Sequence, residues 1–147
     1  MTFELLLIAL HILLAIVIFG PLLTFGVVLP IWIRKGPEMA KPVEAVTKML
    51  DHMGRATPLV FLLGIFIVMK DKSIEFSDGW IGASMGLFIV AIINGMGFIK
   101  PTAAKAAAKL LAGDNADAEA SKLRALTTFA AVLVIAILWL MVKKPGA

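Results

Sequence analysis

LLLIALHILLAIVIFGPLLTFGVVLPIWI, residues 5–33, is an almost uninterrupted apolar run near the start of the chain. A transmembrane helix needs about 20 apolar residues to cross the hydrocarbon core of a bilayer. Over all 147 residues, 61% are hydrophobic and the mean hydropathy is +0.98. The sequence therefore predicts that most of this protein is surrounded by lipid rather than by water.

Three further segments are apolar over a length that crosses a membrane or nearly does, at about residues 50–70, 80–100 and 122–143. A chain of this length has room for one domain only. We therefore predict an all-α fold, an integral membrane four-helix bundle formed by residues 1–147. No basic stretch precedes the first run and no small-residue cleavage site follows it, which favours a retained helix over a cleaved signal peptide.

The basic residues are distributed unevenly among the segments that connect these spans. Ten follow the first and third spans: Arg34, Lys35, Lys41, Lys48, Arg55, Lys100, Lys105, Lys109, Lys122 and Arg124. The other four are Lys70, Lys72, Lys143 and Lys144. Because cytoplasmic loops carry the excess of lysine and arginine, we predict that both long connections are cytoplasmic and that the N- and C-termini are outside.

The two long connections carry helical patterns of their own. Apolar residues recur at steps of four and three over residues 39–53, which predicts an amphipathic helix that runs into the second span with a bend at Gly54 and Pro58. Residues 101–112 form an alanine- and lysine-rich extension of the third span that Gly113 ends. Opposite charges are spaced four residues apart in the pairs Glu44–Lys48 and Asp51–Arg55. We expect helices that protrude on the cytoplasmic side, as charged helices that lie on the inner membrane surface and bind anionic lipid, with a docking site as the alternative.

Several function classes find no support in the composition. The isoelectric point of 9.6 comes from charges beside membrane spans, so no nucleic-acid partner is expected. The chain has no cysteine, which removes disulfides, thiolate metal sites and cysteine nucleophiles. It also has no glycine-rich phosphate loop after a strand and no HExxH pair. No soluble enzyme signature remains.

The third span carries a pattern typical of helix packing. Gly82 and Gly86 are four residues apart, and Asn94 and Gly97 continue along about the same face. Small residues let helices approach closely in lipid, and a lone amide then finds a partner across the interface. This pattern predicts a helix–helix seam inside the bundle; contact with another subunit or with a cofactor is the alternative.

His11 is the residue of the first span that most needs an explanation, because a polar side chain in hydrocarbon is by default a hypothesis about function. Three interpretations compete. The imidazole bonds to Asn94, to a carbonyl of its own helix or to water; it ligates iron or copper through one nitrogen; or it takes part in a proton path with Glu4.

The other histidine, His52, does not complete a metal site with His11. It lies between Lys48 and Arg55 on the charged face of the expected amphipathic helix, at the inner interface. His11 is only about 9 Å into the outer end of its span at 1.5 Å per residue. We therefore expect a solvated His52 and no shared metal ion.

Short motifs along almost the whole chain resemble a family of small bacterial predicted integral membrane proteins of unknown function, common in actinobacteria. The residues that carry the resemblance are Leu10–Ala15, Phe19–Leu22, Leu50–His52 with Arg55, Asp78–Trp80, Lys100–Pro101 and Trp139–Gly146. The resemblance implies a multi-pass protein of the bacterial plasma membrane.

That family is in turn distantly similar to the copper-resistance D proteins and to the HemJ-like protoporphyrinogen oxidases, which share a Leu-His pattern in the first helix. In the HemJ-like proteins this histidine is a heme b ligand and a lysine of the third helix opposes it. His11 matches the histidine. Here the third span contains Asn94 in its middle and Lys100 at its cytoplasmic end, and no interior lysine.

Two hypotheses for the function follow. In the first, the protein handles redox chemistry or a metal through His11, with heme b held in the outer half between the first helix and the third or fourth. Glu4, the Met85 thioether or water is then the second axial ligand, and Gly82 and Gly86 leave room for the macrocycle. In the second, the protein is a non-catalytic accessory subunit that contacts other membrane subunits or a second copy of itself.

Overall fold

The computed structural model describes residues 3–71 and 74–145. The helices are α1 (Phe3–Lys35), η1 (Pro37–Met39), α2 (Ala40–Lys70), α3 (Gly79–Asn94), η2 (Gly95–Ile99), α4 (Lys100–Leu111) and α5 (Asp117–Lys143). No strand occurs in these two ranges. Lys72 and Gly146, which the sequence interpretation used, lie outside the described residues.

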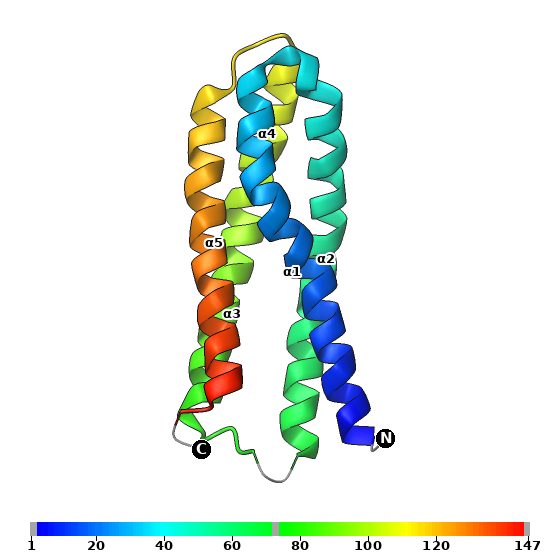
Figure 1. Cartoon of the computed structure of the whole chain (residues 1–147), viewed down its shortest axis with the longest axis vertical. Coiled ribbons are helices and arrows are strands. Elements are labelled where there is room, and N and C mark those ends of the chain that lie inside the picture. Colours follow the sequence, from blue (N-terminus) through cyan, green and yellow to red (C-terminus); the bar gives the residue numbers. More distant parts are fainter. Residues whose placement is uncertain (1–2, 72–73, 146–147) are drawn as a thin grey trace.

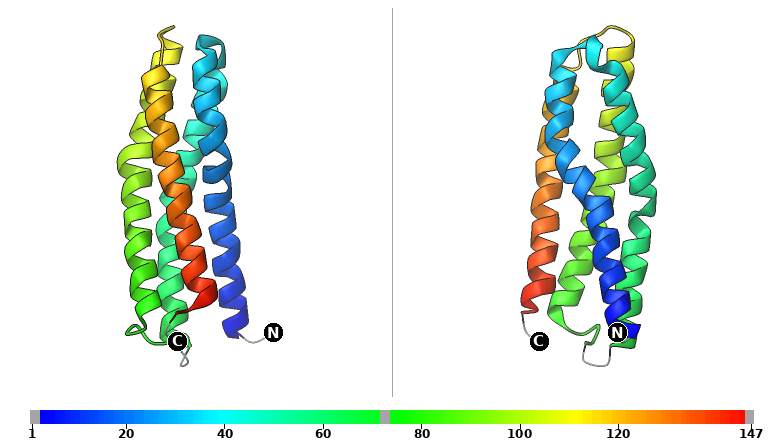
Figure 2. Two further views of the ribbon diagram at one scale, coloured as in Figure 1. Left: turned by 60° about the vertical axis from the view of Figure 1, so that its left-hand side comes forward. Right: turned by 45° about the vertical axis from the view of Figure 1, so that its right-hand side comes forward.

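The helices form four long rods that stand side by side (Figures 1 and 2). α3, η2 and α4 follow one another without a break and make a single rod, so the predicted extension of the third span is confirmed. Each of the four rods is long and apolar enough to cross a membrane. The all-α four-helix membrane bundle is therefore confirmed. Both termini lie at one end, here called the termini end, and the opposite end is the loop end (Figure 1).

Charged residues mark two levels along the rods. From Asp51 to Lys70, α2 rises by about 28 Å at 1.5 Å per residue, close to the thickness of a hydrocarbon core, about 30 Å. The stretch of α5 from Lys122 to Lys143 rises by about 32 Å. Lys100 lies in the third rod near the level of Asp51, with which it forms an ion pair. On the loop-end side of this level, the rods continue beyond the hydrocarbon core of the membrane. We call these parts of the rods the extramembrane cap.

The larger hydrophobic core extends into the extramembrane cap. Its buried members are Leu29, Ile33, Ala40, Val43, Ile99, Ala103, Ala106, Ala107, Leu110, Ala116, Ala120, Leu123 and Ala130. Alanine side chains let the rods approach closely, so these segments bury their apolar faces against one another. The predicted protruding helices are therefore present, but they pack against one another and do not lie on the membrane surface. They stand upright as direct continuations of the spans (Figure 1).

Local features predicted for the cap are confirmed. Glu44 pairs with Lys48 at 2.7 Å, and Asp51 with Arg55 at 2.8 Å. Gly113 follows α4 with φ +82°, a left-handed conformation that suits glycine. Its N–H donates to Leu110 O (3.0 Å) and that of Asp114 to Lys109 O (2.9 Å), the paired bonds that close a helix C-terminus.

The third rod changes its hydrogen-bond pattern at η2, which is a π-helix. The N–H of Lys100 donates to the carbonyl of Gly95, five residues back. Pro101 has no N–H, and its ring crowds the carbonyl group four residues before it. The wider π-helical turn at this point relieves that steric crowding. The sequence interpretation did not predict this turn.

The predicted seam along α3 is only partly present. Asn94 is buried, and its Nδ2 donates to Leu126 O of α5 at 3.0 Å, so the amide finds a partner across an interface as expected. Gly82, Gly86 and Gly97 are exposed instead, and a Cβ built on each meets none of the described atoms within 4 Å. The three glycines do not pack inside the bundle, because α3 turns its buried face, with Ser84 and Phe88, toward the other helices.

The closest approach between α1 and α5 is at Gly26. A Cβ built on Gly26 would lie 2.8 Å from Thr127 Cβ, so only glycine fits. The Thr127 hydroxyl donates both to Leu123 O (2.9 Å) and to Gly26 O (3.1 Å). This contact fixes α1 against α5 near the middle of the bundle.

One buried carboxylate holds the cap together. Glu119, only 5% exposed, accepts from Lys109 Nζ at 2.8 Å and lies 3.2 Å from Lys105 Nζ. It precedes the membrane-crossing part of α5. The hydrogen bond from Lys109, followed by that from Lys105, lowers the pKa of Glu119 from its ordinary 4.5 to about 2.

We expect Glu119→Gln to lower the melting temperature at pH 7 but not at pH 2. Because the folded pKa is lowered, the ionised carboxylate stabilises the fold fully above pH 4.5, and this contribution is lost as the pH falls through about 2. Thermal unfolding in detergent followed by circular dichroism measures the difference. Glu44→Gln, which breaks an exposed pair, is the control and should change little. A difference that persists at pH 2 contradicts the assignment.

Candidate ligand cavity around His11

A cavity of about 110 Å³ lies between the helices in the half of the bundle toward the termini end. α1 and α2 line one side of it, and α3 and α5 line the other. We call it the His11 cavity. Its wall is formed by His11, Ala15, Phe19, Val60, Phe61, Gly64, Ile65, Val68, Trp80, Ile81, Ser84, Met85, Phe88, Val134, Ile137, Leu138 and Met141.

The cavity exists because the helices pack in pairs at this end. α1 lies against α2 and α3 against α5, whereas α2 and α3 make few contacts. Three aromatic rings close the cavity toward the middle of the bundle. Phe88 meets Phe19 edge-on at 5.9 Å between ring centroids and stacks on Phe61 at 5.5 Å. This aromatic cluster leaves an apolar chamber at the depth of the lipid tails.

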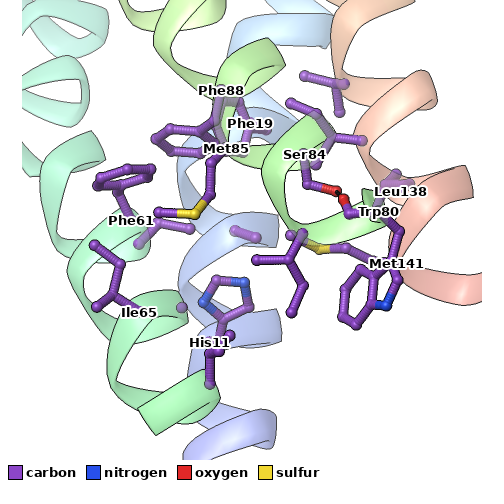
Figure 3. A pocket seen from close by; sticks show the side chains of 17 residues that line it. His11, Phe19, Phe61, Ile65, Trp80, Ser84, Met85, Phe88, Leu138 and Met141 are labelled. Carbon is purple, nitrogen blue, oxygen red and sulfur yellow. Dashed lines mark hydrogen bonds between the residues drawn. The ribbon is translucent and has the colours of Figure 1, made fainter. Parts of the chain in front are cut away.

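The His11 side chain reaches from α1 into this chamber (Figure 3). Its ring fits against α2 because residue 64 is glycine: a Cβ there would lie 3.2 Å from His11 Cε1. The ring nitrogen Nδ1 is buried and makes no hydrogen bond of good geometry with the described residues, although the backbone of Val60 interacts with the imidazole. A buried polar atom without a partner is uncommon and asks for an explanation, such as a ligand.

The partners proposed for His11 from the sequence lie elsewhere. The amide of Asn94 is committed to Leu126 O. Glu4 is exposed and does not line the cavity, so the structure does not bring it together with His11. His52 is also exposed, and its Nδ1 lies 2.7 Å from Lys48 O, in agreement with the expected solvated histidine. Residues 3–71 and 74–145 contain no group of three or more His, Cys, Asp or Glu side chains that could hold a metal ion.

Trp80 lines the chamber and carries a second buried polar atom without a partner among the described residues. It is 7% exposed, and its Nε1 is buried without a partner in the part of the chain that the structure describes. Ser84, one turn on, is committed to the backbone, since its hydroxyl donates to Trp80 O at 2.7 Å. Lys144 Nζ lies 5.5 Å from the centroid of the Trp80 ring, so a cation stands beside the chamber at the termini end.

Two thioethers also line the chamber, Met85 from α3 and Met141 from α5 (Figure 3). Met85 and His11, the two cofactor-binding candidates of the sequence interpretation, thus face one cavity. Gly82 and Gly86 do not contribute the room that we expected of them, because they are exposed on the outside of α3. Gly64 of α2 provides it instead. Gly64, Trp80, Met141 and the three rings of the aromatic cluster are among the cavity residues that the sequence interpretation missed.

Comparison with known proteins agrees with a membrane bundle. The family described as predicted integral membrane protein (DUF2269) matches residues 5–145. No curated protein and no solved structure matches the chain. Since the family model covers almost the whole sequence, this four-helix membrane protein belongs to the DUF2269 family of predicted integral membrane proteins.

Proposed function

We propose that this protein binds heme b in the His11 cavity, with His11 Nδ1 as an axial ligand to the iron, and acts in electron transfer or metal handling within the membrane. The observation that carries the proposal is the buried, unpartnered imidazole nitrogen in an otherwise apolar chamber. An imidazole nitrogen is a common axial ligand of heme iron. The distant similarity of the His11 motif to the copper-resistance D and HemJ-like proteins supports the same ligand.

The remaining wall suits the same group. Phe19, Phe61 and Phe88 offer aromatic faces to a flat macrocycle. The thioethers of Met85 and Met141 would be available to such a heme, and methionine ligation would raise its reduction potential. The free Trp80 N–H and the Lys144 cation suit the carboxylates that a heme carries.

Binding requires the chamber to open. Its volume of about 110 Å³ is smaller than a macrocycle occupies, so the α1–α2 pair must move away from the α3–α5 pair. The few contacts between α2 and α3 allow this movement at the termini end, while the α1–α5 contact at Gly26 holds the two pairs together farther along the bundle. When bound, a heme supplies one-electron chemistry; the protein orients His11 through Gly64 and excludes water with the aromatic cluster.

The test is the heme content of the protein purified from native membranes. The wild type should show a Soret band and about one heme per chain by the pyridine hemochrome assay, and His11→Ala should lose at least nine-tenths of it. His52→Ala, which removes the exposed histidine, is the matched control and should keep its heme. A Soret band that persists in His11→Ala, or a wild type without heme, overturns the proposal.

A second candidate function is that of an accessory subunit. It is favoured by the exposure of Gly82 and Gly86 of α3 and of Gly97 of η2 on the outside of the third rod, because small residues let a neighbouring transmembrane helix approach. We expect Gly82→Leu/Gly86→Leu to remove co-purifying membrane subunits, or a second copy, in blue native electrophoresis. Unchanged migration of the double variant excludes this surface as the contact.

We also propose that the loop end faces the cytoplasm of a bacterial cell and that both termini face outward, since the cap and its boundary with the membrane together carry ten of the 14 basic residues. The absence of natural cysteines allows single-cysteine labelling. A membrane-impermeant maleimide applied to intact spheroplasts should label Glu75→Cys and leave Gly36→Cys and Asn115→Cys unlabelled until lysis. The reverse pattern contradicts the orientation.

A further inference from the structure

A second cavity, of about 90 Å³, lies between α1, α2 and the third rod, at the level where the rods leave the membrane. We call it the loop-end cavity. The aromatic cluster separates it from the His11 cavity, and Phe19 lines both. Its walls are apolar, with Leu22, Met53, Ile92 and Met96 among them. It therefore has room for a hydrocarbon chain on the membrane side of the level at which the rods leave the membrane.

Three charged side chains stand in the wall of the loop-end cavity. Asp51 accepts from Arg55 Nη2 at 2.8 Å and forms an ion pair with Lys100. Two cations and one carboxylate leave a net charge of +1. The side chains of Arg55 and Lys100 are 68% and 48% exposed, so most of their N–H donors stay accessible.

Thr47 adds a free hydroxyl to the same cavity. A helical threonine commonly donates to the carbonyl four residues back, as Thr24 does to Gly20 O (3.0 Å) and Thr128 to Arg124 O (2.8 Å). Thr47 Oγ1 is buried, yet it has no hydrogen-bond partner within the described ranges. Its O–H is thus available to an acceptor in the loop-end cavity.

From these contacts we infer that the loop-end cavity binds one anionic phospholipid. Its phosphate accepts hydrogen bonds from Arg55, Lys100 and Thr47, and one acyl chain enters the apolar part of the cavity. A phosphodiester carries a single negative charge and balances the net charge of +1. The depth agrees as well, because Asp51 lies about 28 Å along α2 from Lys70, one hydrocarbon core away from the opposite interface.

The test compares phosphatidylglycerol with phosphatidylcholine of the same acyl chains, bound to the full-length protein in neutral detergent and counted by native mass spectrometry. Because the wall carries a net charge of +1, equivalent to one basic contact near a membrane surface, we expect a preference for phosphatidylglycerol of about fivefold or more. Equal binding of the two lipids overturns the inference.

Three variants locate the site. Thr47→Val removes the hydroxyl at constant shape, and Gly54→Leu fills the cavity, where a Cβ meets none of the described atoms within 4 Å. Both leave the ion pairs intact, and each should weaken phosphatidylglycerol binding several-fold. Lys48→Gln removes a cation of the same helix that does not line the cavity, and it should change nothing.

The controls separate a bound lipid from other sources of affinity. If Lys48→Gln weakens binding as much as Thr47→Val, the lipid is attracted by the overall charge of the cap and the site is wrong. Inorganic phosphate is titrated against bound phosphatidylglycerol. If millimolar phosphate displaces the lipid and Gly54→Leu has no effect, the site takes a free anion, which also overturns the inference.

Discussion

Gly64→Leu should abolish heme binding while the bundle stays folded. A Cβ at residue 64 already lies 3.2 Å from His11 Cε1, and the rest of a leucine side chain occupies the space of the imidazole ring. His11 then leaves the orientation in which Nδ1 faces the chamber. We expect the hemochrome assay on purified protein to show at least a tenfold loss of heme, with an unchanged far-ultraviolet circular dichroism spectrum.

The matched control is Gly86→Leu. It makes the same chemical change on α3, where a Cβ meets none of the described atoms within 4 Å, and heme content should stay at the level of the wild type. Wild-type heme content in Gly64→Leu contradicts the placement of His11 in the chamber. Loss in both variants indicates a general effect of leucine on the bundle and contradicts it equally.

The second large effect is expected at the crossing of α1 and α5. Gly26→Val places a branched side chain where a single Cβ would already lie 2.8 Å from Thr127 Cβ, so the two helices must separate. Overpacking of this kind costs about 1–3 kcal/mol. Separation also removes the Thr127 hydrogen bond to Gly26 O, so we expect the upper part of that range.

Thermal unfolding in detergent measures this effect, with Gly20→Val as the control. Gly20 lies in the same helix, and no described atom comes within 4 Å of a Cβ built on it, so this variant carries the intrinsic effect of valine without the clash. A melting temperature of Gly26→Val equal to that of Gly20→Val shows that α1 and α5 do not touch there.

The sequence was sufficient to predict the number of helices and their approximate ends, because a long run of apolar residues in lipid forms a membrane-spanning helix. It was not sufficient for the extramembrane cap. Segments such as Lys100–Leu111 have modest hydropathy and regular lysines, which suit a helix on a membrane surface as well as a packed one. Ala106 and Ala120 are buried because residues of four segments pack together around them. The sequence of one segment alone does not show this packing.

The glycines show the same limit at the level of single residues. The spacing of Gly82 and Gly86 indicates that a helix can approach, but the rotation of α3 in the bundle turns both outward. Gly26 and Gly64 have no second glycine three or four residues away and so give no spacing signal, yet they make the close contacts. Which glycine packs is decided by helix rotation, and rotation is a property of the whole bundle.

For the candidate site, the sequence identified His11 and Met85 and missed Trp80. An intramembrane histidine is conspicuous against apolar neighbours, whereas a tryptophan near a helix end is typical of the membrane interface and attracts no special interpretation. Its importance here rests on a buried Nε1 without a partner in the described part of the chain, and only a structure shows that. Ligation of heme by His11 stays a prediction.

The most direct measurement is a hemin titration of His11→Gly protein in the absence and presence of imidazole. The glycine leaves space for a free imidazole in place of the missing side chain. If His11 Nδ1 is the axial ligand, His11→Gly alone should bind hemin at least tenfold more weakly than the wild type, and millimolar imidazole should restore the wild-type Soret spectrum. Hemin binding by His11→Gly that equals the wild type and does not respond to imidazole contradicts the account.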